Sequence, residues 1–137
     1  MASPRILSAV SVRHLRDAAY RQCHAELMRR HSNYHYLVLT TREPENVDPA
    51  SPNYVGKRYL QTLVHSGELE RETGVPLDPR HSHVFLCGSP DMIGASRAST
   101  DVTQAAQPGS MLELLISRGF RCDQPGQPGN VHFERYW

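Results

Sequence analysis

Three basic residues stand at the end of a predicted strand or at the start of a predicted helix, where they could bind an anion. Arg13 follows the first apolar run, Arg42 follows the second, and Lys57 begins a predicted helix. In open α/β sheets, ligands bind at the carboxyl ends of the strands. Guanidinium and ammonium groups there suit a dianionic phosphate. The alternative for each residue taken singly is ordinary solvated surface charge.

A cysteine stands at the end of another predicted strand. Cys87 closes the apolar run at residues 83–87 and is followed by Gly88-Ser89-Pro90. A glycine at this point lets a ligand approach the backbone closely. The alternative is a buried core cysteine, the commoner environment of this residue type.

Aromatic residues in two places offer flat surfaces for stacking. Tyr59 lies beside the cation of Lys57, a combination that suits the adenosine end of a nucleotide, although a half-buried helical tyrosine is the alternative. The chain ends in the strand-like run 131–137, which closes with Tyr136 and Trp137. Because exposed terminal rings would fray, we expect them to dock, either in the core or against a flat ring such as a flavin.

Length and composition indicate one globular domain over residues 1–137. The 137 residues are 39% apolar and 21% charged, with a net charge of +1, so broad binding to nucleic acid or to an anionic membrane is not expected. The three cysteines form no C-x-x-C pair, which favours a reducing cytoplasm over a disulfide framework. We interpret the apolar run at 6–12 as a strand and expect no signal peptide or membrane span.

Apolar runs alternate with helical spacing, which predicts parallel β-α-β units. Strands are expected at 5–12, 34–41, 83–87 and 130–137, and helices at 17–30, 57–66 and 110–118. A polar loop should follow the second strand to residue 53, and Gly67 and Gly119 should end helices. The segment 95–107 is expected to be a loop or insertion, and its role stays open.

Several motifs occur in an order that resembles the NADP-binding domain of ferredoxin–NADP reductases. In sequence order they are Val-Arg-x-x-x-Asp-x-x-Tyr from residue 12, Thr-Arg-Glu from 41, Lys-x-Tyr-x-Gln from 57, Cys-Gly-Ser-Pro-x-Met from 87 and Glu-x-Tyr-Trp from 134. The resemblance implies a three-layer, Rossmann-like parallel sheet. It also implies NADP(H) and FAD as cofactors and ferredoxin or flavodoxin as the electron acceptor.

Roles at the adenosine end also come from the resemblance. Arg13, Arg42 and Lys57 match positions that bind the 2′-phosphate of NADP. Tyr59 and Gln61 match the residues that stack on and hydrogen-bond the adenine.

The resemblance assigns the reacting end as well. Cys87, followed by Gly88, matches the cysteine beside the nicotinamide and flavin N5, where a small side chain leaves room for hydride transfer. Tyr136 matches the aromatic that lies over the flavin as a gate, and Glu134 matches the acid that positions or protonates the flavin region. Trp137 matches a terminal ring that packs on the FAD adenine.

The chain departs from the family at its start. No Gly-rich pyrophosphate-binding turn precedes Arg5, and the N-terminal FAD barrel with its Arg-x-Tyr-Ser motif is missing. Loss of a central strand would leave backbone groups unpaired. Either the first strand pairs directly with another, or a separate FAD-domain chain supplies the missing part, or the reading frame starts late; we favour a late start or a truncated gene.

Other chemistries find little support. His31, His35, His81 and His83 lack a third ligand at suitable spacing, so no metal is expected, and no nucleophile elbow indicates hydrolysis. Two functions follow. The first is hydride transfer between NADPH and a flavin, with one-electron transfer to ferredoxin or flavodoxin. The alternative is a truncated, non-catalytic NADP-binding or partner-dependent α/β module, and the oligomeric state stays open.

Overall fold

The computed structural model describes residues 3–94 and 109–136, and the chain divides into two compact units, residues 1–75 and 76–137. The predicted loop at 95–107 and the terminal Trp137 lie outside the described residues. We describe each unit by itself.

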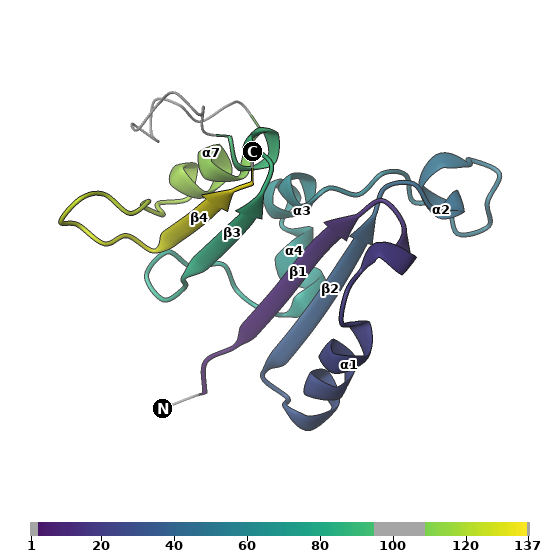
Figure 1. Cartoon of the computed structure of the whole chain (residues 1–137), viewed down its shortest axis with the longest axis horizontal. Coiled ribbons are helices and arrows are strands. Elements are labelled where there is room, and N and C mark those ends of the chain that lie inside the picture. Colours follow the sequence, from purple (N-terminus) through teal and green to yellow (C-terminus); the bar gives the residue numbers. More distant parts are fainter. Residues whose placement is uncertain (1–2, 95–108, 137) are drawn as a thin grey trace. The chain divides into compact units, whose positions relative to one another are not determined.

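The first unit is built on a two-stranded parallel sheet (Figure 1). Strands β1 (Ile6–Val12) and β2 (Tyr34–Thr40) pair in register from Ile6 opposite Tyr34 to Val12 opposite Thr40. Helix α1 (Arg21–Arg30) connects them and packs against β2. A short helix, α2 (Pro44–Val47), follows β2, and α3 (Leu60–Ser66) and α4 (Glu68–Thr73) complete the unit. Its buried apolar side chains are Ala18, Leu39, Leu63, Val64 and Leu69.

The second unit repeats the parallel pairing. Strands β3 (Val84–Gly88) and β4 (Val131–Arg135) run in register from Val84 opposite Val131 to Gly88 opposite Arg135. Helix α5 (Pro90–Ile93) follows β3, and α7 (Met111–Ser117) precedes the 119–130 turn region. The buried apolar side chains of this unit are Leu86, Ile93, Met111, Leu112, Leu115, Phe120 and Val131.

The parallel α/β class and all four strands are confirmed to within two residues at each end. Apolar β-branched runs predict strands well because the same side chains favour extended backbone and burial. The three-layer arrangement and the single domain over residues 1–137 stay predictions.

The predicted helix at 17–30 is wrong over its first turn. A 3-10 turn, η1 (Leu15–Asp17), comes first, and α1 starts at Arg21 because Tyr20 adopts a left-handed conformation with φ of 58°. Such a conformation interrupts a right-handed helix.

Other helix bounds also differ from expectation. The helix predicted at 57–66 starts at Leu60, since Tyr59 is extended. Gly67, left-handed at φ of 79°, ends α3 as predicted, but the chain then turns directly into α4, which was not predicted. The polar loop expected after β2 contains α2, and a proline at the first helical turn of both α2 and α5 supplies a preset backbone angle.

Within the described residues, no helix has the length and apolar character that crossing a membrane requires.

Candidate functional site

The carboxyl edge of the β1–β2 pair brings two predicted site residues side by side. Hydrogen bonding continues beyond the strands: the Thr41 amide donates to the Val12 carbonyl at 3.1 Å, and the Arg42 amide donates to the Arg13 carbonyl at 2.9 Å. Both arginine side chains are exposed. The parallel register therefore makes the two arginines backbone neighbours at the carboxyl edge of the strand pair.

Glu43 secures the turn that follows Arg13. Its Oε1 accepts a 2.8 Å hydrogen bond from the Leu15 amide and lies 3.5 Å from Nδ1 of His14. The carboxylate beside Arg42 is thus used to hold the neighbouring loop. The Thr-Arg-Glu motif gave no sign of this use, because the partner is 28 residues away in the sequence.

Lys57 follows a segment that is tied to α2. The amides of Val55 and Gly56 both donate to the carbonyl of Glu45, at 2.8 and 3.1 Å. Asn46 Nδ2 donates to the Gly56 carbonyl at 2.8 Å. Lys57 is exposed directly after this anchor, so its backbone is held while its ammonium group stays accessible.

None of these three cations is paired with an acid in the part of the chain that the structure describes. Other cations on the chain are paired: Arg58 with Glu72, and Arg80 with Asp78. Exposed guanidinium and ammonium groups without an internal carboxylate are free to bind an external anion.

Two exposed tyrosines flank Lys57. Tyr59, which was predicted, precedes α3 with 44% of its surface exposed, and Gln61 lies half-buried in the first turn of that helix. Tyr54, which sequence reasoning missed, is 45% exposed, and its hydroxyl lies 3.8 Å from where a Cβ of Gly56 would be. The signal that the sequence offered was a tyrosine three residues before Lys57. The segment therefore exposes one tyrosine before the cation and one after it along the chain.

The second unit brings the predicted reacting-end residues together. Cys87 lies opposite Glu134 in the β3–β4 register, and the Tyr136 amide donates to the Gly88 carbonyl at 3.0 Å. A hydrogen bond with the Cys87 side chain raises the pKa of Tyr136 above its ordinary value, and the nearby charges of Cys87 and Glu134 act in the same direction. Cys87 is exposed, so the alternative of a core cysteine is wrong.

Gly88 matters for packing as well as for access. A Cβ at this position would lie 2.7 Å from Cε of Met92. The backbone of Met92 is held by Ser89, whose Oγ accepts a 3.3 Å hydrogen bond from the Met92 amide and caps α5. A side chain at residue 88 would therefore have to displace the Met92 thioether.

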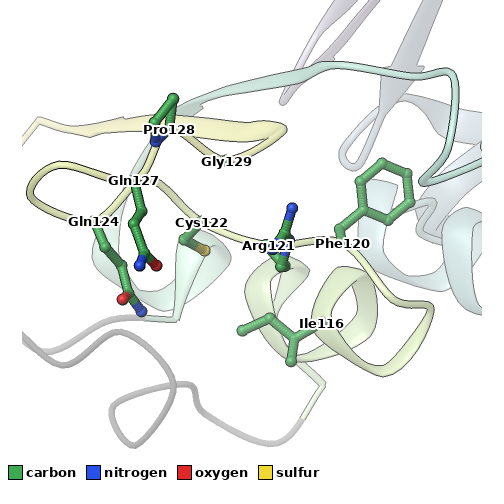
Figure 2. A pocket seen from close by; sticks show the side chains of 8 residues that line it. All are labelled: Ile116, Phe120, Arg121, Cys122, Gln124, Gln127, Pro128 and Gly129. Carbon is green, nitrogen blue, oxygen red and sulfur yellow. The ribbon is translucent and has the colours of Figure 1, made fainter.

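A separate hollow of about 170 Å³ lies beside the end of α7; Figure 2 shows the side chains that line it. Ile116 and Phe120 line one side, and Cys122, Gln124 and Gln127 line the other. Burial raises the pKa of the Cys122 thiol, and the charge of Asp123 adds to this shift. Residues that the sequence nominates for function do not line the hollow.

A pair of histidines lies near Asp123 of the 119–130 turn region. His132 stacks on His83 with ring centroids 5.8 Å apart and is hydrogen-bonded through Nδ1 to Asp123. The Gly129 amide and His132 together lower the pKa of Asp123. Among the described residues, no three His, Cys, Asp or Glu side chains are grouped so as to hold a metal ion.

Known proteins match the chain over part of their length. No family model matches it. Flavodoxin/ferredoxin–NADP reductases of Escherichia coli (strain K12) and Shigella flexneri are each 30% identical over 83 residues, which are 61% of this chain and 31% of the relative. A crystal structure of a ferredoxin NADP+ reductase from Neisseria gonorrhoeae with bound FAD and NADP superposes with a TM-score of 0.66 at 18% identity. The superposition covers 96% of this chain and 44% of the solved reductase chain.

The chain resembles ferredoxin–NADP reductases. The resemblance predicted from the motifs is thereby confirmed, and the fold is that of part of such a reductase. The matched segment spans about a third of the curated reductases, and the structural match covers less than half of the solved reductase.

Proposed function

We propose that the chain is the NADP(H)-binding part of a ferredoxin- or flavodoxin-NADP+ oxidoreductase. The observation that carries the proposal is the edge of the β1–β2 pair, where Arg13 and Arg42 are exposed, joined through their backbones and without acidic partners in the described region. With Lys57 they offer the donors that a dianionic 2′-phosphate requires. Tyr59 and Gln61 would hold the adenine.

The proposal assigns the reacting-end chemistry to residues of the second unit. The thiol of Cys87 is small and exposed at a strand end, and Gly88 leaves the backbone open to a ligand. Tyr136, 59% exposed, would cover the ring face that the nicotinamide must reach, and Glu134 would orient the same region. FAD, when bound, would supply the conversion of a two-electron hydride donor into one-electron steps toward ferredoxin or flavodoxin.

A second candidate is a non-catalytic or partner-dependent NADP-binding module. It is favoured by the sheets, each of which has two parallel strands among the described residues. Parallel sheets are normally larger and covered on both faces. In this case a separate chain would supply the FAD domain.

Calorimetric titration of the purified chain with NADP and with NAD tests the proposal. We expect tighter binding of NADP, because NAD lacks the 2′-phosphate. Equal binding of the two nucleotides, or binding of neither, would overturn it. An absorbance spectrum of the same sample separates the two candidates: bound flavin supports the oxidoreductase, and NADP-selective binding without flavin supports the partner-dependent module.

A further inference from the structure

Asn46 is one of two buried polar residues of the described chain, with 3% of its surface exposed. Its Oδ1 accepts hydrogen bonds from the Thr40 hydroxyl at 2.8 Å and from the Glu43 amide at 3.0 Å. Its Nδ2 donates to the Gly56 carbonyl at 2.8 Å. Both the oxygen and the nitrogen of the side-chain amide are therefore hydrogen-bonded.

These bonds connect the two segments that carry Arg42 and Lys57. Thr40 ends β2, two residues before Arg42, and Glu43 comes directly after Arg42. Gly56 comes directly before Lys57. One buried side chain therefore bridges the backbone on both sides of Arg42 to the backbone that precedes Lys57.

We propose that Asn46 is a positioning residue that holds Lys57 in reach of Arg13 and Arg42 and thereby sets the preference of this site for a 2′-phosphorylated adenosine. The inference rests on the proposed function. A lysine side chain is long and flexible, so its effective charge at a fixed point depends on where its backbone is held. Supporting residues that fix a ligand-binding group commonly decide whether the group acts at full strength.

The chemistry of the bridge explains why asparagine is suited to it. The site needs an acceptor toward β2 and a donor toward Gly56, and a carboxamide supplies both without charge. Aspartate would lack the donor and would place a negative charge close to the phosphate ligands. Leucine would leave the Gly56 carbonyl and the Glu43 amide without these partners.

Adenosine 2′,5′-bisphosphate and adenosine 5′-monophosphate are suitable probes, because they differ in the 2′-phosphate and need neither a pyrophosphate-binding turn nor a flavin. We expect the unmodified chain to bind the bisphosphate more tightly in a calorimetric titration. Asn46→Ala should reduce this preference about tenfold while affinity for the monophosphate stays the same. Thr40→Val removes one bond on the β2 side and keeps the Gly56 bond, so it should retain the preference.

A double-mutant cycle separates positioning from general destabilisation. In a Lys57→Ala background, Asn46→Ala should cause no further loss of preference, because the residue through which it acts is gone. A merely structural role would lower the affinity for both probes in either background. If Asn46→Ala does not fold, Asn46→Ser replaces it, since a serine hydroxyl is too short to reach the Gly56 carbonyl.

The outcomes distinguish this inference from the proposed function. A chain that does not prefer the bisphosphate overturns the proposed function, and the inference with it. A chain that prefers it, with the preference intact in the Asn46 variants, overturns the inference and leaves the function standing. A further loss of preference in the Lys57→Ala background also overturns the inference, because Asn46 would then act through another group.

Discussion

The backbone amide of Arg42 donates a 2.9 Å hydrogen bond to the carbonyl oxygen of Arg13. Arg13 lies one residue beyond the last paired residue of β1, and Arg42 lies two residues beyond the last paired residue of β2. Residues far apart in the sequence are thereby neighbours at one edge, and both side chains are exposed to solvent. Where the two guanidinium groups approach one another without internal carboxylates, they repel unless an anion lies between them. A bound phosphate dianion would relieve this repulsion, which gives the edge a reason to prefer a doubly charged ligand.

Substitution of Arg42 should therefore change phosphate preference more than general nucleotide affinity. We expect Arg42→Ala to lower the ratio of NADP to NAD affinity about tenfold or more, as the loss of a charge-assisted hydrogen bond implies. Arg80→Ala is the matched control, because Arg80 is already bound to Asp78 in the other unit. An unchanged ratio in Arg42→Ala would remove this residue from the phosphate site.

The contact between Cys87 and Tyr136 makes a prediction that needs no cofactor. The bond to Cys87 raises the pKa of the Tyr136 phenol above the ordinary value of 10.0, so Cys87→Ala should lower it. The phenol is neutral when protonated, and a raised pKa means that folding stabilises the neutral form. This stabilisation is fully present below the unfolded pKa and is lost as pH rises through the folded pKa.

Alkaline titration of tyrosinate absorbance measures the effect. The signal of Tyr136 is the difference between a chain with Tyr136 and its Tyr136→Phe variant, taken with and without Cys87→Ala. Cys23→Ala is the control, since Cys23 is an exposed cysteine on α1. If the midpoint for Tyr136 stays the same without Cys87, the thiol does not bond the phenol in solution.

Strands and the candidate site differ in how far the sequence predicts them. The run from Ile6 to Val12 is rich in apolar and β-branched residues, and local preference favours a strand there. Arg13, Arg42 and Cys87 could be nominated because each follows such a run. Their pairing with particular neighbours needed the register, which local sequence does not contain.

Asn46 shows what the sequence could not reveal. An asparagine within a polar, proline-containing segment is typical of a turn, and nothing in the letters indicates that it is buried. Its burial depends on Gly56, ten residues away, whose carbonyl must arrive at hydrogen-bond distance. The late start of α1 has a similar origin. Tyr20 adopts a left-handed backbone, and tyrosine as a residue type gives no indication of this conformation.

Two tyrosines of β2 lie near His24 and should respond oppositely to loss of the hydroxyl. The Tyr34 hydroxyl is hydrogen-bonded to His24 Nδ1 at 2.6 Å. The Tyr36 ring stacks on His24 at 3.9 Å, but its buried hydroxyl has no partner within the described region. We expect Tyr34→Phe to lower the free energy of unfolding by about 1 kcal/mol and Tyr36→Phe to leave it unchanged or raise it by about 1 kcal/mol.

Denaturant unfolding of both variants beside the unmodified chain decides this prediction, with the midpoint compared at constant slope. Burial also raises the pKa of Tyr36, in keeping with a phenol that water does not reach. Equal destabilisation by the two substitutions would show that the Tyr36 hydroxyl has a partner in solution.

Gly129 should be the least replaceable residue of the turn that borders the Cys122 hollow. A Cβ at this position would lie 2.2 Å from the Arg121 carbonyl oxygen and 2.6 Å from the Cys122 carbonyl carbon, which are backbone atoms that cannot rotate away. Arg121 also accepts the Asn130 and Val131 amides through that carbonyl, at 2.9 and 3.0 Å, so a displaced backbone would disturb the start of β4. We expect Gly129→Ala to lower the free energy of unfolding by about 2 kcal/mol or more.

Gln127→Ala is the control, because Gln127 lies in the same turn with an exposed side chain. It should change the free energy of unfolding by less than about 0.5 kcal/mol. Hydrogen exchange of the Val131 amide locates the effect: faster exchange in Gly129→Ala than in Gln127→Ala is expected, and equal exchange would show that the turn accommodates a methyl group.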